Sequence, residues 1–314
     1  MKILVTGGAG FIGSHLVDRL LSKGDDVVCV DNYTLGKKEH LKNALGYQKF
    51  KLCNFNLLEI DRLDNLFKKE KFDFVYHLAA NSDIQAGFNE VKIDLNNTFY
   101  STFNILSCMK KNKVKKIMFA SSSAIYGDLD KKLSEIVGPL LPISNYGAAK
   151  LSSEAYISTF CDNYDMKAWI LRFPNVVGWR LTHGVINDFL YKLSSSPSEL
   201  LVLGDGKQEK PYLYIDDLLN AIHLIVEKSN ENINIFNIGV ESSTTVEFIA
   251  ETTIAELKLK NIKIKYKGGQ KGWIGDVPKF RFDTTKIRKL GWLPTLTSND
   301  AVLLSIQKEI EYRN

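Results

Sequence analysis

The segment KILVTGGAGFIG, residues 2–13, decides the fold. An apolar run comes first, three glycines follow at GxxGxxG spacing, and a helical pattern opens at Phe11. In such a strand–turn–helix, Gly7 permits the tight turn, Gly10 lets the backbone approach a pyrophosphate, and Gly13 lets the helix pack closely on the strand. The helix N-terminus then faces the negative charge. Spacing and context favour a dinucleotide-binding unit over a plain strand–turn–helix corner.

Asp31 ends the next apolar run, residues 26–31. It lies about 20 residues beyond the glycines, where dinucleotide-binding units carry an acidic residue for the adenosine ribose. No Arg stands in its place, and a carboxylate repels a 2′-phosphate. The sequence therefore predicts NAD, rather than NADP, as the cofactor. The alternative interpretation is a turn aspartate before Asn32.

The rest of the first half alternates apolar runs with helical patterns, including one long helix near 89–111. Continuous apolar runs are typical of strands covered on both faces, and their alternation with helices indicates a parallel sheet. The predicted fold class is α/β, a doubly wound parallel Rossmann sheet with a smaller C-terminal substrate-binding lobe. We expect residues 1–174 to form the NAD-binding domain, with 234–240 returning to it, and 175–314 to form mainly the lobe.

Tyr146 and Lys150 are spaced i,i+4 at the start of a predicted helix, which puts both side chains on one face. A Lys ammonium lowers the pKa of a neighbouring phenol, and an oxidised nicotinamide adds a second positive charge. Tyr146 then accepts the proton of a substrate hydroxyl while hydride leaves to the cofactor. Lys150 can also hold the nicotinamide ribose. The hydroxyls of ASSSAIYG, residues 120–127, end another central strand, where one can hydrogen-bond the reacting hydroxyl.

The composition is that of an ordinary globular enzyme, with 45% apolar and 25% charged residues. The lysines behind the net charge of +5 are scattered, which indicates solvated surface rather than a nucleic-acid patch, although the positive balance suits an anionic small substrate. Four cysteines without a CxxC pair favour a reducing compartment over a disulfide framework or a metal site. No signal-peptide pattern and no membrane-spanning apolar run is visible, so a cytoplasmic protein is expected.

Together these motifs resemble the extended short-chain dehydrogenase/reductases, the sugar-nucleotide epimerase and dehydratase family, along nearly the whole chain. Seven motifs of the family match in order along the chain. They are TGGxGFIG at residues 6–13, DN at 31–32, HLAA at 77–80, SSSxxYG at 121–127, YxxxK at 146–150, RxxNxxG at 172–178, and GDGxQ with its following segment at 204–217. The resemblance implies a nucleotide-diphosphate sugar as substrate and a homodimer joined through helices near 89–111 and 145–163. No nucleic acid, membrane or metal is expected as a partner.

Carried over residue by residue, the resemblance makes Tyr146 the base, Lys150 its partner and Ser122 the catalytic hydroxyl. The cofactor-binding residues that it implies are Gly7, Gly10, Phe11, Ile12, Gly13, Asp31, Asn32, Asn54, Phe55, Leu78, Ala79, Ala80, Asn97, Tyr146 and Lys150. The substrate-binding residues that it implies are Ser122, Ser123, Asn175, Lys210 and Arg281.

Departures from the family pattern bear on function. The Asp usual for the adenine amine is Asn54, whose amide oxygen can still accept a hydrogen bond. The usual diphosphate-clamping Arg is Lys210, a point charge that Arg281 can supplement. Dehydratases carry Asp-Glu after the catalytic hydroxyl residue, and decarboxylating members keep the Glu, whereas these positions are Ser123 and Ala124 here. This difference argues against 4,6-dehydration and decarboxylation.

Hydride chemistry at C4 of the sugar remains, and three hypotheses stay open. The first is a 4-epimerase, which returns the hydride to the opposite face of a rotated keto sugar. The second is a 4-dehydrogenase or ketoreductase, for instance on a GDP-linked hexose or heptose. The third is a non-catalytic dinucleotide sensor, which the presence of both Tyr146 and Lys150 disfavours. No histidine is expected to be catalytic, and His40 is expected at the surface.

Overall fold

The computed structural model describes residues 1–314 except 270, 271, 273, 274 and 276. The chain divides into two compact units, each built from three separate segments. Unit 1 comprises Met1–Ile125, Leu141–Arg172 and Ile222–Phe236, and unit 2 comprises Tyr126–Leu140, Phe173–Ala221 and Asn237–Asn314. Compared with the predicted boundary after residue 174, the segment 126–140 thus groups with the second unit and 222–236 with the first.

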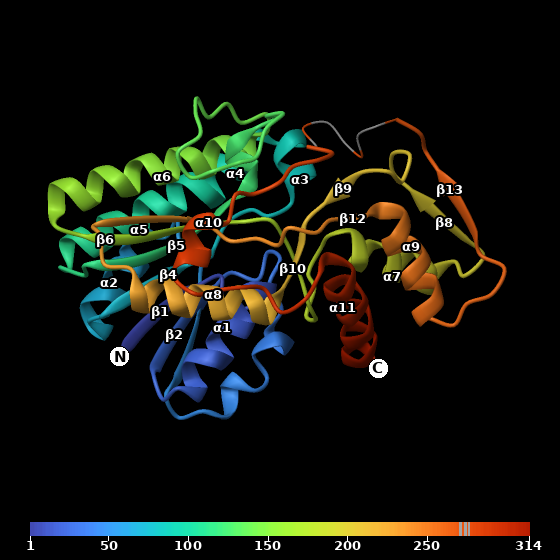
Figure 1. Cartoon of the computed structure of the whole chain (residues 1–314). Helices are drawn as coiled ribbons and strands as arrows, with labels where there is room; N and C mark the ends of the chain where they lie inside the picture. The colour runs from blue at the N-terminus through green and yellow to red at the C-terminus, as the bar shows by residue number, and fades with distance from the viewer. Residues whose placement is uncertain (270–271, 273–274, 276) are drawn as a thin grey trace. The chain divides into compact units, whose positions relative to one another are not determined.

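Unit 1 is built on a seven-stranded sheet in the order β11-β6-β5-β4-β1-β2-β3 (Figure 1). Its strands are β1 (Lys2–Thr6), β2 (Asp26–Asp31), β3 (Phe50–Asn54), β4 (Phe74–His77), β5 (Lys116–Ser122), β6 (Lys167–Phe173) and β11 (Ile233–Asn237). β1 pairs in parallel with β2 on one side and with β4 on the other. The strand order therefore reverses beside β1, and ligands of open α/β sheets bind at this switch point. The predicted α/β class with a parallel Rossmann sheet is confirmed.

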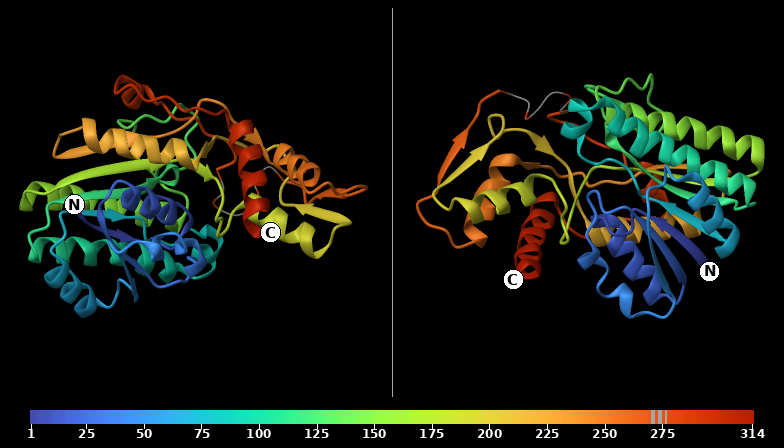
Figure 2. Two further views of the ribbon diagram at one scale, coloured as in Figure 1. Left: turned by 90° about the horizontal axis from the view of Figure 1, so that it is seen from below. Right: turned by 180° about the vertical axis from the view of Figure 1, so that it is seen from behind.

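Helices cover both faces of this sheet. Figures 1 and 2 show α5 and α6 side by side on one face with α2 next to α5, and α1 on the opposite face. The helices are α1 (Phe11–Ser22), α2 (Ile60–Glu70), α3 (Ile84–Asn89), α4 (Val91–Asp94), α5 (Ser101–Lys111) and α6 (Asn145–Tyr164), with short 3-10 turns at Lys38–Leu41, Ala44–Gly46 and Ser123–Tyr126. The main core lies under α2, α5 and α6 and includes Leu4, Val75, Ile105, Phe119 and Ile157, each fully buried.

The long helix predicted near 89–111 has a wider turn in its middle. Residues 91–111 are helical throughout, but the stretch Leu95–Tyr100 is π-helical. A π turn closes i→i+5 hydrogen bonds, so it takes in one residue more than an α turn and shifts the faces of the helix on either side of it. A periodicity count along the sequence cannot see this shift.

Unit 2 is made of short paired strands and helices. β7 (Asn175–Val177) runs parallel to β10 (Tyr212–Tyr214), β8 (Glu199–Val202) parallel to β13 (Lys263–Tyr266), and β9 (Glu209–Lys210) antiparallel to β12 (Thr244–Thr245). Its helices are α7 (Val185–Ser195), α9 (Val246–Glu256), α10 (Thr285–Lys289) and α11 (Ser298–Arg313), while α8 (Ile215–Lys228) starts in unit 2 and ends in unit 1. Thr297 and Asp300 form a capping box at the start of α11.

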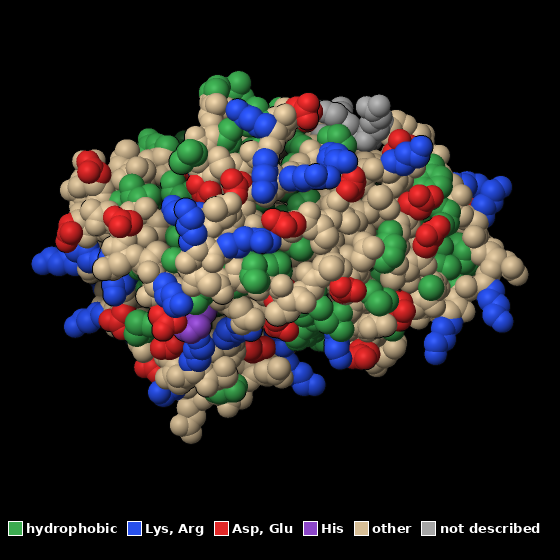
Figure 3. All heavy atoms as spheres, in the orientation of Figure 1, with side chains coloured by type: hydrophobic (Ala, Val, Ile, Leu, Met, Phe, Trp, Pro, Cys, Tyr) green, Lys and Arg blue, Asp and Glu red, His purple; other side chains and the backbone are tan. Residues whose placement is uncertain are grey.

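The face of the molecule drawn in Figure 3 carries charges of both signs. On the face drawn in Figure 3, Lys and Arg side chains are interspersed with Asp and Glu side chains. In the part of the chain that the structure describes, no helix is both long enough and apolar enough to cross a membrane.

Gly13 offers a direct test of the predicted close packing of α1. A Cβ at Gly13 would lie 2.1 Å from the carbonyl oxygen of Gly7 and 2.8 Å from the Cα of Gly8, and backbone atoms cannot rotate away as side chains can. We expect Gly13→Ala to lower the free energy of unfolding by about 1–3 kcal/mol, the usual cost of overpacking. Urea denaturation followed by circular dichroism measures it. Gly46→Ala is the control, because no atom lies within 4 Å of its Cβ position, and equal losses in both variants would contradict the prediction.

Candidate active site

The glycine-rich loop between β1 and α1 leaves no room for a side chain at Gly7. Gly7 has a φ of +70°, and a Cβ there would lie 2.7 Å from the backbone nitrogen of Ala79. Gly10 is the N-cap of α1, and Phe11, Ile12 and Gly13 form its first turn. The backbone N–H groups at this helix start are a site for a phosphate anion. The loop therefore combines a helix N-terminus with the close backbone approach that a pyrophosphate needs.

Asp31 anchors this loop from the end of β2. Its Oδ2 accepts a hydrogen bond from the backbone N–H of Ala9 at 2.9 Å, and its Oδ1 accepts one from Tyr33 at 2.8 Å. Burial raises the pKa of the carboxyl, and the backbone donors partly offset that effect. The expectation that His40 lies at the surface is wrong, because its ring is buried and Nδ1 lies 3.0 Å from the carbonyl oxygen of Ala9. His40 packs beneath the loop, a contact between segments far apart in sequence.

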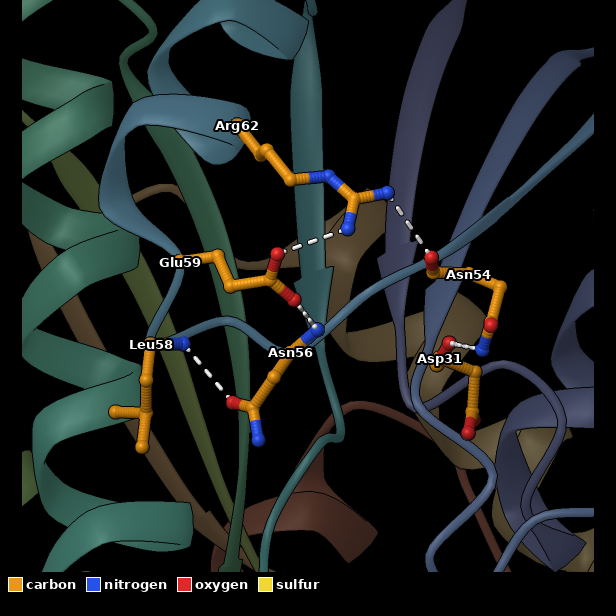
Figure 4. Close-up of polar contacts among 6 residues, drawn as sticks. All are labelled: Asp31, Asn54, Asn56, Leu58, Glu59 and Arg62. Carbon is orange, nitrogen blue, oxygen red and sulfur yellow. Dashed lines mark hydrogen bonds and ion pairs between the residues drawn. The ribbon is translucent and has the colours of Figure 1, made fainter.

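The end of β3 forms a second polar cluster (Figure 4). The side-chain Nδ2 of Asn54 donates to the backbone carbonyl of Asp31 at 2.9 Å. Arg62 on α2 donates to the carbonyl of Asn54 at 3.1 Å and to the carboxylate of Glu59 at 2.8 Å, and its guanidinium lies 4.8 Å from the ring centroid of Phe55. Arg62 was not among the residues predicted from sequence, because its link to this site is a backbone contact. Since Nδ2 of Asn54 donates to Asp31, the side-chain oxygen Oδ1 remains as the atom that can accept a hydrogen bond from an amine.

The segment after β4 lies against the glycine loop. Leu78 donates its backbone N–H to the carbonyl of Thr6 at 3.2 Å, and Ala79 donates to the hydroxyl of Thr6 at 3.3 Å. Ala80 follows directly, so the predicted residues 78–80 lie beside Gly7 at the switch point. Asn97 is half-buried in the π-helical stretch, and its predicted role near the nicotinamide stays a prediction.

Tyr146, Lys150 and Ser122 meet where α6 passes the end of β5. Ser122 hydrogen-bonds the Tyr146 hydroxyl and also accepts from the backbone N–H of Ala124 at 3.2 Å. Lys150 is 2% exposed, and its Nζ donates to the carbonyl of Ala120 at 2.6 Å. The same ammonium lies 5.8 Å from the centroid of the Tyr146 ring. The i,i+4 spacing therefore brings both Tyr146 and Lys150 to the end of β5, as predicted.

The pKa values at this site differ from the sequence expectation. Removal from water raises the pKa of Tyr146 to about 12, and the hydrogen bond from Ser122 opposes that shift. Burial also lowers the pKa of Lys150 to about 7, although Glu154 and Asp94 hold it up. Burial dominates the pKa of both groups in this structure, and the ammonium is directed to a carbonyl. The predicted lowering of the phenol pKa by Lys150 and the nicotinamide stays a prediction.

A buried carboxylate that sequence reasoning missed lies one helical turn beyond Lys150. Glu154 is 5% exposed and binds Arg172 through Nε at 3.1 Å and Nη2 at 2.7 Å, while Ser121 donates to the same carboxylate. The i,i+4 rule that singled out Tyr146 and Lys150 also puts Glu154 on this face, and that was the available signal.

The remaining predicted residues lie mostly in unit 2. Asn175 begins β7 and Lys210 ends β9, and both are half-buried. Arg281 is exposed, and its backbone carbonyl accepts from the N–H of Leu133 at 2.8 Å. Ser123 opens the 3-10 turn after β5 in unit 1. Their roles in substrate binding stay predictions.

The arrangement in unit 1 can perform proton transfer at a hydroxyl next to a bound dinucleotide. A phenol hydrogen-bonded to a serine hydroxyl can pass a proton to or from a substrate oxygen. A buried ammonium beside it can titrate near neutral pH, and perturbed groups of this kind cluster at functional sites.

Comparisons with known proteins identify the family of this chain. The model of the NAD dependent epimerase/dehydratase family matches residues 3–239. A putative UDP-glucose 4-epimerase of Methanocaldococcus jannaschii is 32% identical over 305 residues, which cover 96% of this chain and 95% of that protein. The crystal structure of a UDP-glucose 4-epimerase from Thermotoga maritima with UDP-glucose is 32% identical, with a TM-score of 0.89 and all of both chains covered. That of a Thermus thermophilus UDP-glucose 4-epimerase in complex with NAD is 27% identical, with a TM-score of 0.87 and 99% of both chains covered.

Asp31 should decide the preference for NAD over NADP. Asp31→Asn keeps the shape of the side chain but removes the charge that we expect to bind ribose hydroxyls and repel a 2′-phosphate. We expect the affinity for NAD to fall by about 10- to 150-fold, since a hydrogen bond to a charged group contributes about 1.5–3 kcal/mol, and the NAD/NADP affinity ratio to fall with it. Isothermal titration of both cofactors measures this. Asp165→Asn, at a 99% exposed side chain, is the control, and an unchanged ratio in Asp31→Asn would contradict the assignment.

Proposed function

The chain belongs to the NAD-dependent epimerase/dehydratase family, and we propose that it interconverts the C4 epimers of a UDP-linked hexose. UDP-glucose 4-epimerases are among its relatives over the whole chain, and one of the similar structures contains UDP-glucose. The proposal narrows the nucleotide to uridine diphosphate, which the sequence alone left open.

The residues at the switch point fit NAD. The Gly7 and Gly13 positions, which a Cβ would fill, leave the backbone open to a pyrophosphate, and Asp31 ends β2 where a ribose hydroxyl donates. We assign Asn54 to the adenine amine, and residues 78–80 to the wall of the site. When bound, NAD supplies the hydride acceptor of the first half-reaction, the hydride donor of the second, and a positive charge in its oxidised form.

Proton transfer is assigned to Tyr146. Its phenolate oxygen takes the proton of the sugar O4 hydroxyl as hydride leaves C4, and the phenol so formed returns the proton to O4 after the keto sugar has rotated. Ser122 hydrogen-bonds both the Tyr146 hydroxyl and the sugar oxygen, so it holds the two in line. Lys150 supplies a buried positive charge that stabilises the phenolate, and it binds the nicotinamide ribose.

The observation that carries epimerisation over the family's other reactions is the short turn after β5. Residues Ser123 and Ala124 begin this turn directly beyond the catalytic Ser122. Dehydratases and decarboxylating members use a carboxylate here, and neither a hydroxymethyl nor a methyl side chain exchanges protons with a sugar carbon. The proposal leaves only hydride transfer at C4.

Unit 2 supplies the substrate-binding residues in this proposal. We assign Asn175 and Lys210 to the uridine diphosphate, with Arg281 as a second cation for the same two phosphates. An ammonium is a point charge rather than a planar fork. The proposed clamp therefore depends on both cations together.

The test is incubation of purified protein with UDP-glucose or UDP-galactose, followed by NMR of the products. We expect both C4 epimers to reach equilibrium without added NAD and without a lasting absorbance of reduced nicotinamide. Tyr146→Phe should lower kcat by about 10²–10⁴-fold, the usual contribution of a positioned acid–base group. Tyr164→Phe on the same helix is the matched control. Accumulation of a keto sugar with reduced nicotinamide would make the protein a 4-dehydrogenase, and turnover of GDP-sugars alone would overturn the uridine assignment.

We also propose that the protein is a homodimer through the outer face of α5 and α6. Large apolar side chains are exposed along this face, including Tyr100 (45%), Phe103 (37%) and Tyr156 (43%). The rings of Phe103 and Tyr156 pack edge to face at 5.8 Å, so the two helices present one continuous aromatic surface. Surfaces of this kind mark protein interfaces, and a second copy of the same face is the partner that a two-fold axis supplies.

Charge placed on this face should separate the subunits. We expect the wild-type protein to have the mass of two chains in light scattering, and the double variant Tyr100→Glu/Tyr156→Glu to have that of one, because an interface core excludes unpaired charges. Tyr47→Glu, at a similarly exposed tyrosine elsewhere in unit 1, should remain dimeric. A monomeric wild-type protein would refute the proposal.

We also propose that the protein is cytoplasmic. It is supported by the four cysteines, which carry free thiols and of which Cys29, Cys108 and Cys161 are buried. Free thiols are typical of reducing compartments.

A further inference from the structure

Three consecutive residues at the end of β5 each bind a different residue on one face of α6. The carbonyl of Ala120 accepts from Lys150 at 2.6 Å. The hydroxyl of Ser121 donates to Glu154. The hydroxyl of Ser122 hydrogen-bonds Tyr146. The partners on α6 are spaced i, i+4 and i+8, which puts them along one face of the helix. Each bond fixes the register of the strand against the helix. The contacts of Ala120 with Lys150 and of Ser122 with Tyr146 therefore depend on the contact of Ser121 with Glu154, because Ser121 lies between Ala120 and Ser122 on the strand.

Glu154 is the most constrained member of this set. It is 5% exposed, and Arg172 at the end of β6, 3% exposed, binds both of its oxygens. A buried carboxylate is costly unless it is paired and fully hydrogen-bonded. Arg172 and Ser121 together satisfy it, so the ion pair fixes β5, β6 and α6 to one another at the point where the reaction occurs.

Glu154 also belongs to the charges that surround the Lys150 ammonium. On the same helix these are Glu154 and the Tyr146 phenol, on α4 the buried Asp94, and on β4 the buried His77. Glu154 and Asp94 raise the pKa of Lys150, and burial lowers it further than they raise it. Burial lowers the pKa of His77 to about 3, with a smaller contribution from Lys150, so His77 is neutral and does not compete as a cation.

We propose that Glu154 is a positioning residue of this active site: held by Arg172, it fixes Ser121, sets the register of Ser122 against Tyr146, and keeps a negative charge one helical turn from Lys150. Only the predicted effect on kcat rests on the proposed function. Within the part of the chain that the structure describes, the Glu154 carboxylate accepts hydrogen bonds from Arg172 and Ser121 rather than from Tyr146, Lys150 or Ser122.

Glu154→Gln tests the charge while keeping the shape. We expect kcat for epimerisation to fall at least about tenfold with KM changed less than about twofold, since small misplacements at a reacting centre cost up to about 10²-fold. The alkaline limb of the pH–kcat profile should move to lower pH. Removing the anion destabilises the protonated ammonium, so Lys150 loses its proton at lower pH and activity is lost earlier as pH rises. Asp162→Asn, an exposed carboxylate on the same helix, is the matched control and should leave both readouts unchanged.

A second measurement needs no substrate and separates this proposal from the proposed function. In protein isotope-labelled at lysine Cε, NMR titration should show one lysine with a pKa lowered to about 7, absent in Lys150→Met and shifted to lower pH in Glu154→Gln. If the labelled Lys150 signal shifts but no UDP-sugar is turned over, the positioning role stands and the proposed function fails. If Glu154→Gln is folded and has the kcat, pH profile and Lys150 titration of the wild type, with only a lower melting temperature, Glu154 is merely structural and the proposal is overturned.

Discussion

The close approach of backbone to backbone beside β1 is the constraint on which the rest of the structure depends. At Gly7 a methyl group would lie 2.7 Å from the nitrogen of Ala79, and at Gly13 it would lie 2.1 Å from the carbonyl oxygen of Gly7. These two contacts bring the exits of β1 and β4 and the start of α1 into one place. Because the strand order reverses here, a crevice for a dinucleotide opens at this point in a doubly wound sheet. Asp31 and His40 then hold the loop from either side through Ala9.

At the carboxyl ends of the strands the structure also buries an ion pair, Glu154 and Arg172. Burying charge usually costs stability. Replacing a buried ion pair by apolar groups is often neutral or stabilising, whereas removing one partner costs about 3–5 kcal/mol. The Glu154–Arg172 pair is therefore weak evidence for stability as such. Its value lies in geometry, since a carboxylate with three donors around it allows only one arrangement of β5, β6 and α6. A catalytic site on a rigid strand end and a helix face needs that kind of precision.

The sequence predicted the sheet and the cofactor loop because both depend on local pattern. Continuous apolar runs indicate strands covered on both faces, and the glycine spacing indicates the turn, so neither needed knowledge of distant contacts. The positions of His40 and Arg62 depended on such contacts, with Ala9 and with the carbonyl of Asn54, and were missed. The raised pKa of Tyr146 could not be predicted from sequence, because the charge of Lys150 can be inferred from spacing, whereas the loss of water around both groups cannot.

The two buried carboxylates near the catalytic pair act differently on it. Asp94 raises the pKa of Lys150 and also that of Tyr146, so it favours the ammonium but disfavours the phenolate that the reaction needs. Glu154 raises the pKa of Lys150 alone among these two groups. A negative charge at Glu154 thus supports the positive charge beside the base without opposing ionisation of the base itself. Arg172 contributes to this separation, because it binds the carboxylate from the side of β6 and holds it at one place on the helix. The charge of Glu154 on α6 therefore favours the Lys150 ammonium that the reaction needs. The charge of Asp94 on α4 also favours this ammonium, but it disfavours the Tyr146 phenolate.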